Sequence, residues 1–541
     1  MTKLCFADVA PAVPLPATGR QWYTYRLPVR LQPLMTRYNS VTVPFGHRLV
    51  PGVVMALHGV PPGRRLHDVQ AVVSGALTFE QVRLARWIAK VSQGGLGYTL
   101  RLFLPGRRVP PAPMHPIPRR RACHRLAAAD RALIDHDYTR RCTRLASLLH
   151  QQIKACCQVA VIVPERWMAK PLQLALSAST PARYAVLHAG LRQSQRSAIW
   201  HQVRDGHIDV IVGTHRALFL PWRSLGLVVI EEESFAAHKQ WDQYPRLHNI
   251  YTAQMLARLH RASVIYTSMF PSLWLRQAIA ERAVTASEQK PLSLAFTIVP
   301  YAVVDRGQRL VLPQQLLAQL RQWIMKGERV LLYYNRRRRE FLTATARQSG
   351  LNAPSDRLAL ATSAVFTQRA GETYDFIVWL WPETYLTYPD WRGSERILHT
   401  AARLHQLLKN NHQRQLFIVT RRQQVAALFE RPPAQVIEEL LDERRRLMYP
   451  PFSDLVRLSV LGSNAAAAWQ NGVSVRHRLA VRAKRADVAV KIRGPFHSRA
   501  AVPRRATAAV HLVIAGRLPT LVTLYHGLPL AAAEVAPHQT V

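Results

Sequence analysis

Acidic side chains follow a buried-strand candidate in the middle of this chain, where they could take part in phosphoryl-transfer chemistry. The run Glu231 to Ser234 comes directly after the apolar segment Leu227 to Ile230, and the run Ser268 to Pro271 comes after Ser263 to Tyr266. In nucleotide-driven motors, one carboxylate at such a place holds a metal-bound water and another orients the attacking water. A solvated strand end uses the same residue types, so these residues alone leave both interpretations open.

Three short apolar segments must position these side chains. Val210 to Val212, Leu227 to Ile230 and Ser263 to Tyr266 are separated by polar stretches with helical spacing. That alternation predicts a parallel α/β sheet with crossover helices. Ligands of open α/β sheets bind beyond the carboxyl ends of the strands, so the acidic run is placed to face one.

The sequence around these strands resembles one known family. The segment VIVGTHRALFLPWRSLGLVVIEEES, which ends at Ser234, resembles the part of the bacterial replication-restart helicases (PriA, primosomal protein N′) that carries their DEEH box. The segment YTSMFPSLW resembles the SAT-type box that follows it. The resemblance makes Glu231 and Glu232 the catalytic candidates, at the Asp and Glu positions of the box. Because Glu replaces the shorter Asp and Ser234 replaces the His, we expect this box to be degenerate and inactive.

The resemblance also implies a phosphate-binding P-loop before the strand Val159 to Val163. Such a loop needs Gly, so that backbone N–H groups can wrap a phosphate, and a Lys that reaches the β- and γ-phosphates. No Gly occurs from Arg107 to Ala189, and no Lys lies between Lys90 and Lys154. Arg141 is the residue that could bring positive charge to a nucleotide phosphate. We therefore expect the P-loop to be lost.

A second region of strands and helices begins after residue 287. An amphipathic helix is predicted at Gln314 to Met325 and a strand at Val330 to Tyr334. The run Asn335 to Arg338 then matches the family's NRRG box except for its Gly, which makes Arg336 a second nucleotide-binding candidate.

Two features that the resemblance implies for this second region are missing. The family inserts a zinc module with eight Cys after the NRRG box, but no Cys follows Cys157, so we expect no zinc. The family's next box carries arginines that touch the γ-phosphate. No Gly occurs from Ser394 to Leu461, and we expect Arg403 and Lys409 there to be helix surface charges.

The N-terminal region reads as a small all-β module. Residues 20–59 alternate apolar and polar positions, with Gly and Pro at the breaks. The same region resembles the family's DNA-binding domain, in which aromatic rings for base stacking and a cation for phosphate line a pocket for the 3′ end of a strand. The residues of this chain that match the family's pocket are Tyr23, Thr24, Tyr25, Phe45, Gly46 and Arg48. The alternative is that Tyr23 and Tyr25 are ordinary strand residues.

Two further segments connect this module to the sheets. Residues 80–105 show helical spacing and are similar to the family's winged-helix segment, although such a unit can equally be a spacer. The following Pro-rich stretch is typical of an extended, semi-rigid linker. Its charge could follow a phosphate backbone, which makes DNA-binding candidates of Arg119, Arg120 and Arg121.

Composition limits the class of partner. The chain has 541 residues, with 73 Lys and Arg against 32 Asp and Glu, a formal net charge of +41. Such a charge favours a polyanion, first of all nucleic acid, although a general drift toward Arg would raise it without making a binding face. The five Cys show no metal-ligand spacing. No run of about 18 apolar residues occurs, so we expect a cytoplasmic protein without membrane contact.

These observations predict a multidomain α/β protein. A C-terminal α+β domain is indicated by the alternating apolar positions from Ala509 to Ile514. The expected divisions are a β module for DNA 3′ ends at 1–62, a winged-helix-like segment at 63–106, a linker at 107–121, two RecA-like lobes at 122–286 and 287–446, and the C-terminal domain at 447–541.

The resemblance implies a DNA-binding protein of replication restart that recognises branched or forked DNA, 3′ ends and single strands. Its expected partners are primosome proteins, the replicative helicase or its loader, and single-strand-binding protein. We expect no cofactor and no ATP hydrolysis. The alternatives are an active ATP-dependent 3′-to-5′ DNA helicase, which would use ATP and magnesium, and a general nucleic-acid-coating protein.

Overall fold

The structure is a computed structural model, and it describes most of the chain. The described residues are 5–15, 19–59, 66–74, 76–105, 129–240, 243–286, 296–300, 312–335, 339–348, 350–351, 355–362, 365–368, 372–387, 390–409, 415–498 and 508–535. Arg119 to Arg121 and Arg336 lie outside these residues.

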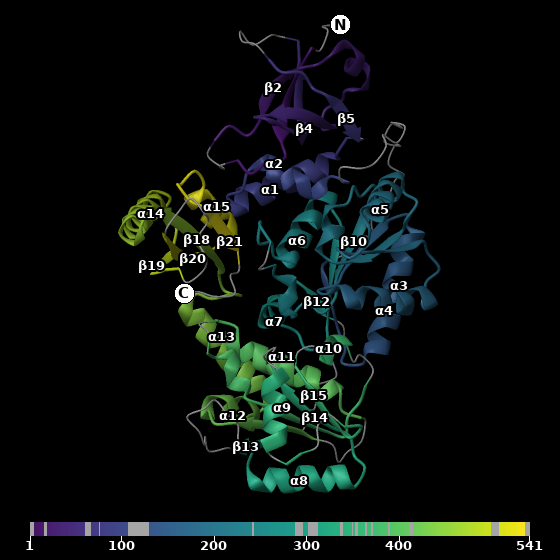
Figure 1. The fold of residues 1–541 in the computed structure, drawn as a ribbon, viewed down its shortest axis with the longest axis vertical. Coiled ribbons are helices and arrows are strands. Elements are labelled where there is room, and N and C mark those ends of the chain that lie inside the picture. Colours follow the sequence, from purple (N-terminus) through teal and green to yellow (C-terminus); the bar gives the residue numbers. More distant parts are fainter. Residues whose placement is uncertain are drawn as a thin grey trace.

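The N-terminal residues form one antiparallel five-stranded sheet of order β2-β1-β4-β3-β5 (Figure 1). Val, Ala and Tyr side chains alternate toward its core, as the sequence pattern predicts. Strand β5 lies beyond residue 62 and still pairs with β3, so this sheet extends into the segment expected to be winged-helix-like. Its elements are β1 (Phe6–Pro11), β2 (Tyr23–Arg26), η1 (Val29–Leu34), β3 (Ser40–Phe45), β4 (Arg48–His58) and β5 (Ala71–Ser74).

Two helices and a 3-10 turn join this sheet to the rest of the chain: α1 (Phe79–Ser92), α2 (Leu96–Leu100) and η2 (Arg101–Phe103). Helix α1 begins with a capping box, in which the Thr78 hydroxyl accepts from the Gln81 N–H and the Gln81 side chain accepts from the Thr78 N–H. The Gln81 amide also donates to the carbonyl of Phe219, 2.8 Å away, which ties α1 to the next sheet.

Lobe 1 is built on a parallel seven-stranded sheet of order β12-β6-β11-β10-β7-β9-β8. Strands β7, β9, β10 and β11 fall on the apolar runs seen in the sequence. The elements are β6 (Arg131–Ile134), α3 (Tyr138–Lys154), β7 (Gln158–Ile162), α4 (Arg166–Ser179), β8 (Tyr184–Leu187), α5 (Gln193–Asp205), β9 (Val210–Gly213), η3 (His215–Phe219), β10 (Leu225–Ile230), η4 (Ala236–His238), α6 (Asn249–His260), β11 (Ser263–Ser268), α7 (Leu273–Ala280) and β12 (Thr285–Ala286).

Lobe 2 has a parallel five-stranded sheet of order β13-β17-β16-β14-β15. The predicted helix at 314–325 and strand at 330–334 are present with those bounds. The elements are β13 (Phe296–Pro300), α8 (Gln314–Met325), β14 (Val330–Tyr334), α9 (Arg339–Gln348), β15 (Leu358–Ala361), α10 (Val365–Gln368), β16 (Phe376–Leu380), η5 (Pro382–Tyr385), α11 (Gly393–Gln406), β17 (Leu416–Thr420), α12 (Gln423–Glu430) and α13 (Pro433–Leu447).

The C-terminal region is an antiparallel four-stranded sheet, β19-β20-β18-β21, with two helices. It lies beside lobe 1 and is reached through α13 from lobe 2 (Figure 1). The expected fold class is confirmed: an N-terminal β sheet, two parallel sheets and a C-terminal α+β unit. These elements are β18 (Asp454–Gly462), α14 (Ala465–Arg485), β19 (Lys491–His497), β20 (Ala508–Gly516), α15 (Leu518–Tyr525) and β21 (Ala532–Val535).

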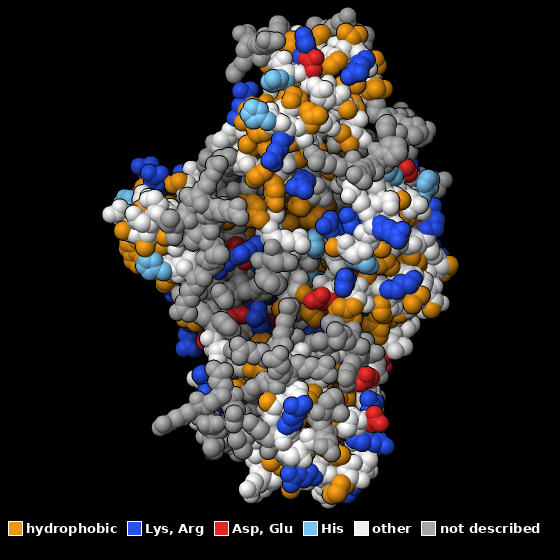
Figure 2. All heavy atoms as spheres, viewed as in Figure 1, with side chains coloured by type: hydrophobic (Ala, Val, Ile, Leu, Met, Phe, Trp, Pro, Cys, Tyr) orange, Lys and Arg blue, Asp and Glu red, His pale blue; other side chains and the backbone are white. Residues whose placement is uncertain are grey.

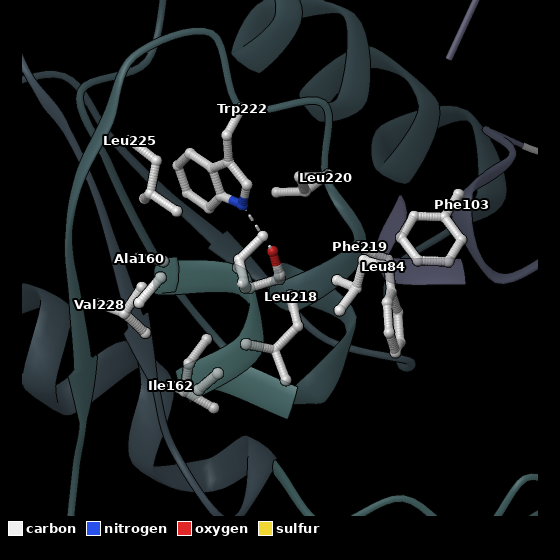
Figure 3. Packing of buried hydrophobic residues seen from close by; sticks show 14 of the residues in the cluster. Leu84, Phe103, Ala160, Ile162, Leu218, Phe219, Leu220, Trp222, Leu225 and Val228 are labelled. Carbon is white, nitrogen blue, oxygen red and sulfur yellow. Dashed lines mark hydrogen bonds between the residues drawn. The ribbon is translucent and has the colours of Figure 1, made fainter. Parts of the chain in front are cut away.

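One hydrophobic core runs from the N-terminal sheet through α1 into lobe 1. Figure 3 shows the part of it in which Leu84 and Phe103 approach lobe 1. Leu84 of α1 and Phe103 meet Phe219, whose ring centroid lies 5.1 Å from that of Phe103. The indole of Trp222 is buried and donates to the carbonyl of Ala217, 3.1 Å away. This continuous packing gives the N-terminal sheet a fixed place relative to lobe 1. In the described part of the chain, the helices are all too short or too polar to span a bilayer.

Candidate nucleic-acid interface and interlobe site

The acidic run lies at the carboxyl end of β10, as expected, and each of its carboxylates has a partner within the protein. Glu231 is buried and accepts a hydrogen bond from the Thr267 hydroxyl on β11. Glu232 has a φ of 50°, a left-handed conformation that residues other than Gly rarely adopt. Its N–H donates to the Thr267 hydroxyl, 3.2 Å away, which helps to hold this conformation.

Arg141, the proposed phosphate ligand, instead binds both catalytic candidates. Its Nη2 lies 3.3 Å from Oε1 of Glu231 and forms a shorter ion pair with Glu232, and its Nη1 donates to the carbonyl of Asp135 at 2.8 Å. Burial acts to lower the pKa of Arg141, but the carboxylates of Glu232 and Glu231 outweigh it and raise this pKa. Burial raises the pKa of Glu231, and Arg141 opposes that rise. The guanidinium of Arg141 is therefore the counter-ion of both carboxylates.

The start of α3, where a P-loop would hold phosphate, is occupied by the chain's own carboxylates. Asp137 caps the helix by accepting from the Arg140 N–H at 3.1 Å, and Asp135 accepts from the Asp137 N–H at 2.9 Å. A helix N-terminus binds anions through its free N–H groups, and two of the N–H groups here already have an anionic partner. These residues are a poor fit for a magnesium-bound nucleotide, because carboxylates stand at the start of α3 and Arg141 pairs with both Glu231 and Glu232.

Glu233, the third acidic residue, faces the start of α7. Its two oxygens accept from the N–H and the hydroxyl of Ser272, at 2.7 and 2.8 Å. Burial raises the pKa of Glu233 to about 7, with smaller contributions from Glu395 and Glu232. This carboxyl is therefore partly protonated near neutral pH. Among the described residues, no group of three or more His, Cys, Asp or Glu side chains is placed to hold a metal ion.

Two cations at the end of helix α11 of lobe 2 were expected to be surface charges. Arg403 is not one, because its guanidinium lies over the rings of Phe235 in lobe 1 and Phe366 in lobe 2, 4.1 and 3.9 Å from their centroids. Lys409 follows the end of α11 and its side chain is 36% exposed; its Nζ binds both oxygens of Asp375, at 2.9 and 2.7 Å. Burial lowers the pKa of Arg403, because the two rings exclude water from it.

The structure brings together some of the residues proposed for the 3′-end pocket. The rings of Tyr23 and Phe45 meet edge to face, 5.3 Å apart, and the guanidinium of Arg20 lies 5.3 Å from the Tyr23 centroid. Phe45 and Arg48 flank the β3–β4 turn, in which Gly46 has a φ of 59° and so suits a residue without a side chain. An aromatic pair and two arginines can offer stacking and phosphate contacts at this edge of the sheet.

Tyr25 and Thr24 do not join the Tyr23–Phe45 pair. Tyr25 is only 4% exposed, its hydroxyl donates to the carbonyl of Pro44, and burial raises its pKa to about 12. Thr24 points to the opposite face of β2, since successive strand residues alternate, and its hydroxyl donates to Asp8 at 2.7 Å. Tyr25 is therefore a core residue here, and Thr24 does not share a face with Tyr23.

A group of arginines in lobe 1 was missed by the sequence interpretation. Arg166, Arg192, Arg196 and Arg216 follow the carboxyl ends of β7, β8 and β9, and in the described part of the chain none has a carboxylate within 4 Å. The Nε of Arg216 is buried without a hydrogen-bond partner among the described residues, and burial and the charge of Arg196 lower the pKa of Arg216. Figure 2 shows Lys and Arg side chains gathered beside this lobe. The signal in the sequence was that at least one arginine follows each of these three strands.

Comparison with known proteins agrees with these features. A family model described as the 3′DNA-binding domain (3′BD) of PriA matches residues 11–105. The replication restart protein PriA of Chlamydia pneumoniae is 28% identical over 162 residues. The chain is PriA-like.

Parts of the chain are similar to other PriA proteins too. PriA of Haemophilus influenzae is 28% identical over 192 residues, or 35% of this chain and 26% of the relative, and PriA of Bacillus subtilis is 26% identical over 187 residues, or 33% and 23%. The match to the Chlamydia protein covers 28% of this chain and 21% of the relative, so the PriA-like chain aligns with only about a fifth to a quarter of these proteins. The solved Mycobacterium smegmatis helicase Lhr bound to single-stranded DNA and AMP-PNP superposes with a TM-score of 0.35 at 14% identity, covering 55% of this chain and 44% of that one.

Proposed function

We propose that this PriA-like chain recognises branched or forked DNA in replication restart and does not hydrolyse ATP. The observation that carries the second part is Arg141, whose guanidinium binds both Glu231 and Glu232. Catalysis of phosphoryl transfer depends on positioned charge around a metal-bound phosphate. Here the carboxylates that would serve the metal and the water are already paired with the buried guanidinium of Arg141.

The helix N-terminus and the lobe 2 arginine support the same conclusion. Asp135 and Asp137 place negative charge at the start of α3, which repels a phosphate instead of attracting it. Arg403, the cation that α11 brings to the boundary between the lobes, is held by two aromatic rings. The acidic run, the start of α3 and Arg403 are thus all in contact with other groups of the protein.

The DNA-binding part of the proposal rests on the matched 3′DNA-binding domain and on two surfaces. The Tyr23–Phe45 pair with Arg20 and Arg48 suits a strand end, because aromatic rings stack on bases and arginines bind phosphates. The lobe 1 arginines, by which we mean Arg166, Arg192, Arg196 and Arg216, suit the phosphate backbone of a DNA strand that crosses the carboxyl ends of β7, β8 and β9. The excess of cations over the whole chain favours such a polyanion.

Further parts of the proposal concern organisation and partners. We propose the domain divisions expected from the sequence, except that the N-terminal β module extends to β5 (Ala71–Ser74). We further propose Arg119 to Arg121 as an additional contact to a DNA backbone and Arg336 as a former nucleotide ligand. We also propose primosome proteins, the replicative helicase or its loader, and single-strand-binding protein as partners in the cytoplasm.

The deciding experiment measures phosphate release from ATP with and without forked DNA. We expect no release above the buffer background and no effect of Glu232→Gln, because the site is already silent. Hydrolysis that forked DNA stimulates and Glu232→Gln abolishes would establish the active 3′-to-5′ helicase instead. Competition between forked and linear DNA completes the test, since equal affinities would indicate a general coating protein.

A further inference from the structure

One face of α11 contacts lobe 1 at every turn of the helix. Glu395, His399, Arg403 and Gln406 stand at positions i, i+4, i+8 and i+11, a spacing that puts side chains along one stripe of a helix. In Figure 1, α11 lies on the side of lobe 2 that faces α7 of lobe 1. We call these four residues the α11 stripe.

The first contact of the stripe joins the two lobes at a helix N-terminus. Oε1 of Glu395 accepts from the N–H of Leu273, the first residue of α7, at 2.8 Å. Oε2 of Glu395 pairs with Arg444 at 2.8 Å. Burial acts to raise the pKa of Glu395, but Arg444 and nearby cations outweigh it and hold this pKa well below its usual range. An ionised carboxylate of lobe 2 thus meets the positive end of a lobe 1 helix.

The other contacts are aromatic and backbone contacts. The ring of His399 meets Phe270 of lobe 1 edge to face, with centroids 5.4 Å apart. Arg403 has Phe235 of lobe 1 on one side and Phe366 of lobe 2 on another, at 4.1 and 3.9 Å. The side chain of Gln406 donates to the carbonyl of His136, in the loop before α3, at 2.8 Å.

We propose that the α11 stripe is a latch that keeps the two lobes closed without a nucleotide. All four residues contact groups of lobe 1 directly, and these contacts can hold lobe 2 against lobe 1. A ligand shifts a conformational equilibrium only through different affinities for the two states. The lobes then act as one rigid body that presents the lobe 1 arginines and the N-terminal sheet at a constant spacing.

This inference goes beyond the proposed function, because the latch could hold whether or not ATP is hydrolysed. The test is single-molecule energy transfer in the full-length protein between dyes at Leu174 of α4 and Met325 of α8, introduced as bio-orthogonal amino acids. Both side chains are exposed, at 54% and 81%, and they belong to different lobes. We expect a single transfer efficiency that stays the same when a non-hydrolysable ATP analogue and magnesium are added. A shift on addition of the analogue would overturn the proposal.

Variants of the latch give the second arm of the test. Arg403→Ala removes the cation–aromatic contact with Phe235, which crosses between the lobes; the contact with Phe366 lies inside lobe 2 and does not change when the lobes open. We therefore expect the ratio of open to closed molecules to rise on the order of 3- to 30-fold. Arg403→Lys keeps the charge but loses the planar group, and should give an intermediate rise. A transfer distribution equal to that of the parent in both variants would refute the latch.

The control variant is Arg431→Ala. Arg431 pairs with Glu439 within lobe 2 and its side chain is 39% exposed, so its loss removes an arginine without touching the α11 stripe. Its distribution should match that of the parent. Circular dichroism of each variant verifies folding, and Phe235→Leu, which weakens the same interlobe contact from the lobe 1 side, supplies a second probe if Arg403→Ala does not fold. Phosphate release from ATP is measured on the same samples. Release would contradict the proposed absence of ATP hydrolysis, whereas a transfer efficiency of the parent that changes with the analogue, without release, would contradict only the latch.

Discussion

Replacing Arg141 by Met should destabilise lobe 1, because Arg141 is the cation that satisfies two carboxylates. Arg141 and Glu231 have side chains only 3% and 2% exposed, while the side chain of Glu232 is 14% exposed. Glu232 can be hydrated when its partner is lost, but Glu231 cannot. The cost of the substitution therefore comes mainly from one buried and unpaired carboxylate.

The expected magnitude follows from that burial. Removing one partner of a buried ion pair costs about 3 to 5 kcal/mol, because the other charge is left in the interior. Adding Glu231→Gln to Arg141→Met removes that charge and should restore most of the lost stability. The destabilisation should also be smaller at pH 5 than at pH 8, because burial raises the pKa of Glu231 and the carboxyl can be protonated at the lower pH.

Native-state hydrogen exchange of the β10 and β11 amides is the suitable assay. A chain with several domains does not unfold in one step, whereas exchange reports the local free energy of each sheet. Arg144→Met is the matched control, since Arg144 lies on the same helix, is 44% exposed and is 3.9 Å from Asp135. Equal protection in Arg141→Met and Arg144→Met would show that Arg141 is not the counter-ion of the acidic run.

Three further predictions concern DNA and pH. Tyr23→Ala should weaken binding to a fork with a free 3′ strand by about 1 to 3 kcal/mol and leave blunt duplex binding unchanged; fluorescence anisotropy on the two substrates tests this, and equal losses would contradict it. Arg166→Ala with Arg216→Ala should make the slope of log K against log salt shallower by about 1.8 for duplex DNA, at about 0.9 per phosphate contact; an unchanged slope would remove these residues from the interface. Between pH 4.5 and 7 the parent should lose about 3 kcal/mol of stability that Glu233→Gln keeps. The folded-state pKa of about 7 lies above the ordinary 4.5, so the folded state holds more protons in this window and stability falls as pH rises. Native-state hydrogen exchange of the β10 and α7 amides across this pH range measures the difference, and parallel curves for the two proteins would contradict it.

The elements were largely predictable from the sequence because their signals are local. Apolar runs marked β9, β10, β11 and β14, and the amphipathic period marked α8 with its observed bounds. The boundary of the N-terminal sheet was less predictable. Strand β5 is short, and only its pairing with β3 makes it part of that sheet.

The site was predictable only in part, because side-chain partners depend on residues far apart in the chain. Arg141 and Glu231 are brought together by the parallel order of β6, β11 and β10, which no local pattern specifies. Tyr23 and Tyr25 look alike in the sequence. Tyr23 is partly buried and meets the ring of Phe45, whereas Tyr25 is buried in the core of the same sheet and its hydroxyl donates to the carbonyl of Pro44.

The sequence by itself determined which groups are present. It showed that no Gly could form a phosphate loop between Arg107 and Ala189, that the acidic run follows a buried strand, and that cations greatly exceed carboxylates. These are properties of residue type and order, and folding cannot change them.

Only the tertiary structure decided what those groups do. Arg403 appeared to be a surface charge because its helix is polar, yet the approach of lobe 1 places Phe235 over it. Arg141 appeared available to a phosphate, yet strand order places two carboxylates against it. Electrostatic energies depend on distance and burial, and both are set when the sheets and lobes pack together.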